Sequence, residues 1–123
     1  MLGCSMNNKK ELGTWGEKLV ADKLKQDGFT ILERNYQKRY GEIDIIAQKD
    51  LLLVFVEVKL RRNPYFDSAQ LVTHTKQRKI IAVAKEYIAK HTDVDKLCRF
   101  DVALVEWQAG KPYITYLDNA FSE

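Results

Sequence analysis

The sequence predicts an α/β layered domain in which a mixed sheet is flanked by helices. An amphipathic stretch over residues 11–27 has apolar residues at helical spacing, and three strand-like apolar runs follow it between residues 29 and 61. A second amphipathic stretch covers residues 75–90 and precedes two further strand-like runs. A helix between the third and fourth strands is the crossover that makes those strands parallel neighbours. The expected order is helix, three strands, helix, strand and one extra C-terminal strand.

Length and composition set the limits of this domain. The 123 residues suffice for one domain that buries a core without disulfides or a structural metal. No apolar run approaches the roughly 18–20 residues of a membrane span, and the start of the chain is too polar for a secretory signal. Cys4 and Cys98 match no zinc or redox spacing. We therefore expect a flexible segment over residues 1–10, a single domain over residues 11–120, a cytoplasmic location and no membrane partner.

The first helix carries one carboxylate at the edge of its buried face. Its apolar stripe consists of Leu12, Trp15, Leu19, Val20 and Leu24. Glu17 lies beside this stripe, because Val20, Ala21 and Leu24 follow it at helical spacing. Taken alone, Glu17 could instead be a surface carboxylate that the helix macrodipole stabilises. Gly28 is a plausible cap that ends this helix.

Residues 29–36 alternate as a first strand, and residues 37–40 turn the chain into residues 41–61. That stretch contains two apolar runs around a polar break, and four charged residues interrupt them: Glu42, Asp44, Glu57 and Lys59. Burying an unpaired charge costs several kcal/mol or more, so these groups must be compensated. Because strand side chains alternate, Glu42 and Asp44 share one face of their strand, and Glu57 and Lys59 share one face of theirs.

The loop between these two strands decides whether the carboxylates meet. A four-residue loop over residues 49–52 is expected to place Asp44 opposite Glu57. A two-residue turn, the alternative, is expected to place the two side chains on opposite faces. The four-residue loop is favoured because it groups the charges. Two facing carboxylates with Lys59 beside them form an oxygen-rich pocket suited to a divalent cation. The alternative is a partly buried ion-pair cluster with no chemistry.

The second half of the chain supplies positive charge. Pro64 ends the third strand, residues 63–74 form a loop that includes His74, and a helix covers residues 75–90, with Lys76 at the entrance of its buried face. Strands follow over residues 99–107 and 112–117, and Asp101 is expected to be structural, paired with Arg99 or a loop amide. From residue 59 to residue 90 there are eight basic and two acidic residues, a net +6, against −3 for the remainder. Such a field is typical of a polyanion partner, although a solvated helix face is the alternative.

Five motifs together resemble one family. They are Gly-x-x-Gly-Glu at residues 13–17, GEIDIIA at 41–47, VFVEVKLR at 54–61, Lys-Gln-Arg at 76–78 and RFDV at 99–102. In this order they resemble the YraN family of predicted endonucleases, which is similar to the archaeal Holliday-junction resolvases. The resemblance covers residues 12–105 and implies a restriction-endonuclease-like αβββαβ core, with a homodimer as a further expectation.

The resemblance also implies roles for the charged residues. By position, Asp44 and Glu57 resemble metal-binding carboxylates, the Val58 backbone carbonyl a third ligand, Lys59 the catalytic lysine and Glu17 an extra helix acid. The expected cofactor is Mg²⁺ or Mn²⁺, since Mg²⁺ keeps several waters and takes only one or two carboxylates.

The expected activity is metal-dependent hydrolysis of DNA phosphodiester bonds, on branched or distorted DNA. Basic residues would hold the phosphate backbone without reading bases. Those expected to do so are Arg61, Arg62, Lys76, Arg78 and Lys79. The alternative function is a nucleic-acid-binding or adaptor module that has the nuclease fold but no turnover.

Overall fold

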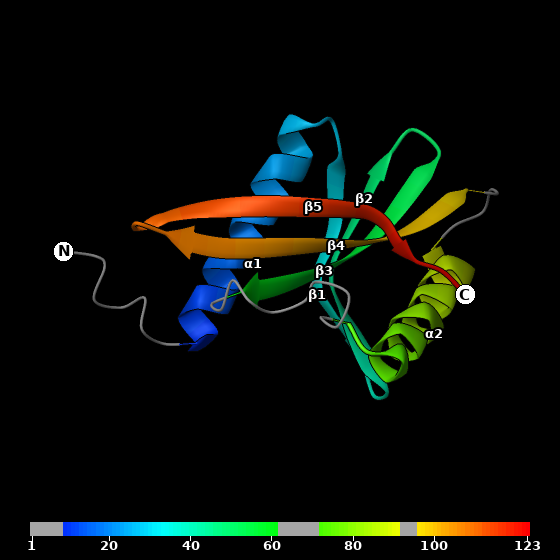
Figure 1. Cartoon of the computed structure of the whole chain (residues 1–123). Coiled ribbons are helices and arrows are strands. Elements are labelled where there is room, and N and C mark those ends of the chain that lie inside the picture. The colour runs from blue at the N-terminus through cyan, green and yellow to red at the C-terminus, as the bar shows by residue number, and fades with distance from the viewer. Residues whose placement is uncertain (1–8, 62–71, 92–95) are drawn as a thin grey trace.

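The computed structural model describes residues 9–61, 72–91 and 96–123, and it has the expected element order (Figure 1). The elements are α1 (Lys9–Gln26), β1 (Thr30–Lys38), β2 (Gly41–Lys49), β3 (Leu52–Arg61), α2 (His74–His91), β4 (Leu97–Gln108) and β5 (Lys111–Phe121). The α/β fold class, with an αβββαβ core and one extra strand, is therefore confirmed. In the part of the chain that is described, neither helix combines the length and apolar character needed to cross a membrane.

Most element ends differ from the sequence prediction by a few residues. α1 begins at Lys9, two residues early, and β1 continues to Lys38, so that only Arg39 and Tyr40 form the turn into β2. His74 was placed wrongly in a loop, since α2 begins there. Residues 63–71 of that expected loop lie outside the described residues.

The sheet contains all five strands in sequence order. β3 and β4 are parallel, joined through α2, and the other neighbours are antiparallel. Alternate residues of β3 enter two cores: Val54 and Val56 pack with Val20 of α1, whereas Leu53 and Phe55 pack with residues of α2. The two helices therefore cover opposite faces of the sheet, and the middle of β3 is buried on both sides.

The connection between β2 and β3 is shorter than expected. Lys49 pairs with Leu52, so that Asp50 and Leu51 form a two-residue turn. The expected four-residue loop was wrong, and so was the inference that a two-residue turn would separate the carboxylates. Relative to the expected four-residue loop, the pairing of Lys49 with Leu52 makes each strand one residue longer. It does not change the register, because Gln48 is opposite Leu53 in both cases.

The β1–β2 hairpin is twisted near its middle. Ile43 and Ile45 are two residues apart on β2 and would share a face in a regular strand. Instead, Ile45 packs in the core under α1 and Ile43 in the core under α2. On β1, Asn35 has a φ of 53°, in the left-handed region that asparagine tolerates better than most residues. Asp44 lies at this change of face, just beyond Ile45–Val56, the last pair of the β2–β3 ladder.

Asp101 is fully buried in β4, and every contact around it is structural. Arg99 donates from Nε and Nη2 to its two carboxylate oxygens at 2.9 and 3.0 Å. Tyr116 Oη donates to Oδ2 at 2.5 Å, and the backbone N–H of Asn119 donates to Oδ1 at 2.9 Å. The expected pairing with Arg99 is confirmed, although the amide comes from β5 and not from a loop. This carboxylate is fully satisfied, so it holds β5 against β4.

Candidate metal-dependent active site

The site lies where β2 and β3 separate. Their ladder runs from Lys49–Leu52 to Ile45–Val56, and Asp44 and Glu57 are the next residues in the same register. Beyond Ile45–Val56 a side chain links the two strands: the backbone N–H of Val58 donates a hydrogen bond to Asp44 Oδ2 at 2.8 Å. In an antiparallel pair, the N–H and C=O of one residue point to the same neighbouring strand. The Val58 carbonyl therefore points toward the Asp44 side of β3.

The two carboxylates are buried together. Asp44 is 8% exposed and Glu57 3%. Burial raises the pKa of Asp44 to about 8, and a side-chain hydrogen bond to Glu57 and the charge of Glu57 add to this rise. Two neighbouring carboxyl groups disfavour a second negative charge, which is why the charge of Glu57 raises the pKa of Asp44. A divalent cation would relieve this repulsion, and the donor set of two carboxylates and a carbonyl therefore fits a hard metal ion.

Two ammonium groups face the same oxygen of Glu57. Lys59 Nζ lies 3.8 Å from Glu57 Oε2, and Lys76 Nζ forms a direct ion pair with that oxygen. Burial, and then the charge of Lys76, lower the pKa of Lys59. Burial is the largest single effect on Lys76 and lowers its pKa, but the hydrogen bond to Glu57 and the charge of Glu57, with smaller contributions from Lys59 and Asp44, together outweigh burial and raise the pKa overall. Lys76 is thus the counterion of Glu57, and Lys59 is the more easily deprotonated ammonium.

Glu17 reaches the edge of this site from α1. An added Cβ at Gly16 would lie 3.1 Å from Leu60 Cδ2, so α1 approaches β3 closely there. Glu17 is half-buried, with Arg34 Nη2 3.9 Å from its Oε1. Burial raises the pKa of Glu17, opposed by a hydrogen bond from Asn35 and by the charge of Arg34. Glu17 is therefore not the solvated carboxylate of the alternative interpretation.

Glu17 still stands apart from the carboxylate pair. The charge of Glu57 helps to raise the pKa of Glu17, and the charge of Glu17 helps to raise that of Asp44. Yet across residues 9–61, 72–91 and 96–123 no three Asp, Glu, His or Cys side chains are grouped to hold a metal ion. Glu17 is within electrostatic range of the pair without joining it as a third ligand.

The residues expected to hold phosphate are spread over several environments. Arg61 ends β3 and is half-buried, and Arg62 lies outside the described residues. Arg78 and Lys79 are exposed on α2, where Arg78 Nη2 lies 3.5 Å from Thr75 Oγ1. Lys76 instead joins the carboxylates. The sequence signal for this placement was its position one turn before the buried Ile80, whereas nothing in the sequence indicated that Arg34 and Asn35 would hold Glu17.

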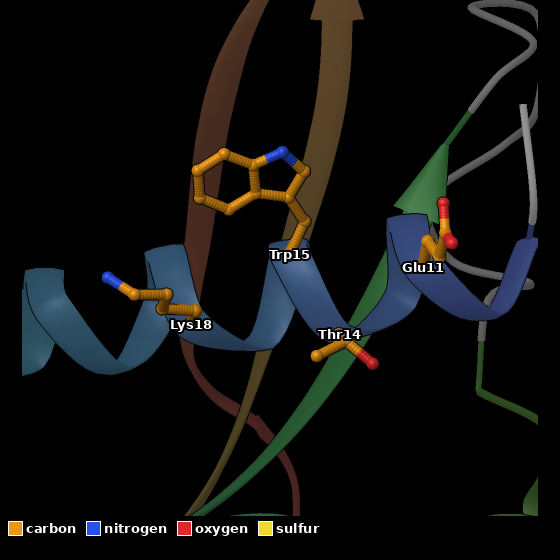
Figure 2. Close-up of a pocket in the computed structure, with 4 residues that line it drawn as sticks. All are labelled: Glu11, Thr14, Trp15 and Lys18. Carbon is orange, nitrogen blue, oxygen red and sulfur yellow. The ribbon is translucent and has the colours of Figure 1, made fainter. Parts of the chain in front are cut away.

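A hollow of about 340 Å³ beside α1 is not part of the site. Glu11, Thr14, Trp15 and Lys18 line it. Figure 2 shows these side chains leaving α1 in different directions and spread along the helix. Glu11 is the one acidic residue among the described residues that line it, and these show no converging carboxylates like those between β2 and β3.

Comparison with known proteins identifies the family. The model of the uncharacterised protein family UPF0102 matches residues 16–105. The chain belongs to this family. The match confirms the resemblance to the YraN family, and the matched segment includes Glu17, Asp44, Glu57, Lys59 and Lys76.

Relatives in this family match almost the whole chain. A UPF0102 protein of Dictyoglomus thermophilum is 46% identical over 117 residues, covering 93% of this chain and 99% of its own length. One from Geobacter metallireducens is 42% identical over 118 residues, covering 95% and 96%. Another, from Dichelobacter nodosus, is 42% identical over 119 residues, covering 93% and 94%. The domain described here is thus the main part of these UPF0102 proteins.

The pairing of Lys76 with Glu57 gives a first testable prediction. Lys76→Met should lower the free energy of unfolding by about 1–3 kcal/mol in chelator, because it removes the closest counterion of a buried carboxylate. The loss stays below that of a fully unpaired charge, since Lys59 remains 3.8 Å away. Urea unfolding measures the change.

Lys79→Met is the matched control for this experiment. Lys79 is one turn further along α2 and exposed, so the same substitution there should change stability by less than about 0.5 kcal/mol. Equal stability of the Lys76→Met variant and wild type would mean that the ion pair contributes nothing.

Proposed function

We propose that this UPF0102 protein is a metal-dependent nuclease that hydrolyses DNA phosphodiester bonds, with branched or distorted DNA as its substrate. The observation that carries this proposal is the buried pair Asp44 and Glu57 at the separation of β2 and β3. The raised pKa of Asp44 supports it, because a carboxyl pair that repels itself has no evident structural purpose. Asp101 offers the contrast, since the fold surrounds it with partners.

The proposed ion is Mg²⁺ or Mn²⁺, held by Asp44, Glu57 and the Val58 carbonyl. When bound, it would polarise a phosphoryl oxygen and acidify a coordinated water. Glu57 and Asp44 would be deprotonated in that state, because ligand carboxylates must lose their protons. Glu17, at the edge of the site, would orient water through its own carboxylate.

The two lysines have distinct proposed tasks. Lys59, whose pKa burial lowers, would orient the attacking water or neutralise charge that develops on the phosphoryl group. Lys76 would leave Glu57 when the carboxylate takes the metal ion, and its ammonium would then be available to the substrate phosphate. The side chains of Lys59 and Lys76 are each about one-third exposed, so a DNA phosphate could reach both ammonium groups from solvent.

A nucleic-acid-binding or adaptor module without turnover is the second candidate. One observation favours it: among the described residues, no third acidic or imidazole side chain completes a ligand set. The basic segment, residues 59–90, would bind DNA whether or not the protein binds a metal ion. Such binding should weaken steeply with salt, because each neutralised phosphate releases counterions.

The test compares cleavage in metal and in chelator. Purified protein is incubated with supercoiled plasmid and with synthetic four-way junctions, in Mg²⁺, Mn²⁺ or chelator. The nuclease proposal requires cleavage in metal alone. Salt-sensitive binding without cleavage in any metal would select the binding module, and equal cleavage in chelator would indicate a contaminant.

A further inference from the structure

The tip of the β1–β2 hairpin and α2 enclose a hollow of about 520 Å³, lined by residues 37–42 and Lys79, which we call the turn hollow. Figure 1 shows the hairpin tip beside α2. An added Cβ at Gly41 would lie 3.2 Å from Lys79 Cβ and 3.3 Å from Val83 Cγ2, so the β2 backbone packs directly on the helix. The turn hollow is therefore formed by two elements in contact.

Glu86 of α2 fixes the hairpin tip. Tyr40 Oη donates a hydrogen bond to Glu86 Oε2. Lys38 Nζ lies 3.8 Å from Glu86 Oε1, and Lys90 Nζ donates to the same oxygen at 2.7 Å. The hydroxyl of Tyr40 is thus held while the residue remains 43% exposed. A ring in a fixed position loses little conformational entropy when a flat group stacks on it.

Basic side chains also line the turn hollow. Arg39 and Lys79 are exposed, and neither has an ion-pair or hydrogen-bond partner among the described residues. Among the described lining residues the one carboxylate is Glu42, which accepts a hydrogen bond from Gln37 Nε2 at 3.1 Å. Two cations without a partner among the described residues, beside an exposed aromatic ring, match the chemistry of a nucleotide in a single strand, whose phosphate is anionic and whose base presents a flat face.

Two elements join the turn hollow to the carboxylate pair. On β2, Glu42 precedes Asp44 by two residues, about 7 Å along a strand. On α2, Lys79 follows Lys76 by three residues, about 4.5 Å along a helix. The turn hollow therefore lies on the order of one nucleotide away from the proposed cleavage site.

We propose that the turn hollow binds one nucleotide of an unpaired DNA strand, next to the phosphate held at the carboxylate pair. Arg39 and Lys79 contact the backbone, and the base stacks on the ring of Tyr40. In a duplex the neighbouring bases already cover both faces of each base, so Tyr40 can stack only on an unpaired one. This inference rests on the proposed function and narrows its substrate to DNA that contains a single-stranded segment.

Fluorescence anisotropy in chelator tests the turn hollow without cleavage. The probes are a labelled single strand of about 12 nucleotides, within the size range of single-strand sites, and a blunt duplex of the same sequence. Tyr40→Leu should weaken single-strand binding by about 5- to 150-fold and leave duplex binding unchanged. The double variant Arg39→Gln, Lys79→Gln should reduce the salt slope for the single strand by about 1.4, or 0.7 for each lost phosphate contact.

Two control variants separate stacking from other effects. Tyr40→Phe loses the hydroxyl contact with Glu86 but keeps the ring, so it should lose much less single-strand binding than Tyr40→Leu. Tyr113, on β5, is also exposed, and Tyr113→Leu should change nothing. Single-strand binding by Tyr40→Leu at the wild-type level, or equal loss with Tyr113→Leu, would overturn the inference.

The cleavage assay distinguishes the two proposals. Metal-dependent cleavage combined with no effect of Tyr40→Leu on single-strand binding would overturn the turn hollow alone. Loss of single-strand binding in Tyr40→Leu, in a protein that never cleaves, would support the turn hollow and refute the nuclease.

Discussion

Glu57→Gln should lower the rate of metal-dependent DNA cleavage by about 10³-fold, equivalent to about 4 kcal/mol of transition-state stabilisation. Glu57 is 3% exposed, lies in register with Asp44 and faces both ammonium groups. Glutamine keeps the shape of the side chain but not its charge, so the proposed metal ion loses one of its two carboxylates. The measurement is the single-turnover rate in Mg²⁺ on a branched DNA that carries a single-stranded segment.

A matched control separates this loss from general effects of removing a carboxylate. Asp22 is paired with Lys18 at 3.0 Å on the exposed side of α1, and Asp22→Asn should cleave at the wild-type rate. Thermal unfolding of each variant shows whether it is folded at the assay temperature. A folded Glu57→Gln variant that cleaves within about threefold of wild type would remove Glu57, and with it the proposed metal site, from the mechanism.

The sequence predicted the fold well because its signals are local. Helical spacing in α1 and α2, and apolar runs bounded by turns, depend on neighbours within a few residues. The alignment of Asp44 with Glu57 was also predictable, although the loop argument behind it was faulty. The four-residue loop and the two-residue turn give the same register, because Gln48 is opposite Leu53 in both. The error in loop length therefore did not affect the alignment of Asp44 with Glu57.

Features that depend on tertiary placement were harder to predict. Lys76 was assigned to phosphate binding with Arg78 and Lys79; its position one turn before Ile80 placed it at the entrance of the buried face of α2, but nothing in the sequence indicated that it would pair with Glu57. Its contact with Glu57 depends on how α2 lies against β3. The change of face at Asn35 has a weak sequence signal, because an asparagine within a strand-like run adopts a positive φ only when packing requires it. The turn hollow joins β1, β2 and α2, so no single stretch of sequence could reveal it.

The stability of the metal-free protein should fall as the pH rises from about 4 to about 8, and Asp44→Asn should abolish most of this fall. Burial and the neighbouring Glu57 raise the pKa of Asp44 from 3.8 to about 8, so the folded protein binds this proton more tightly than the unfolded chain. The stabilising contribution is complete below the unfolded pKa and is lost as the pH rises through the folded one. The slope is at most about 1.4 kcal/mol per pH unit.

Urea unfolding of wild type and Asp44→Asn in chelator, at several pH values, measures this difference. Comparing the two proteins at each pH largely removes the contribution of other titrating groups. At neutral pH, Asp44→Asn should be as stable as wild type or more so, because asparagine is neutral in the unfolded chain as well and needs no proton uptake on folding to avoid a second negative charge beside Glu57. Millimolar Mg²⁺ should stabilise wild type, since an ion that binds only the folded state raises stability by mass action, and should stabilise Asp44→Asn less.

A structural ion-pair cluster makes the opposite prediction. If Asp44 were needed to neutralise the lysines, Asp44→Asn would destabilise the metal-free protein by about 3 kcal/mol at neutral pH, and wild type would not respond to Mg²⁺. The geometry argues against this outcome, because both ammonium contacts are made to Glu57, whereas Asp44 accepts its hydrogen bond from the Val58 backbone. Asparagine can still accept that bond through its side-chain carbonyl. The substitution therefore removes the charge while it preserves the contact between β2 and β3, and any loss of Mg²⁺ response can be assigned to the charge of Asp44.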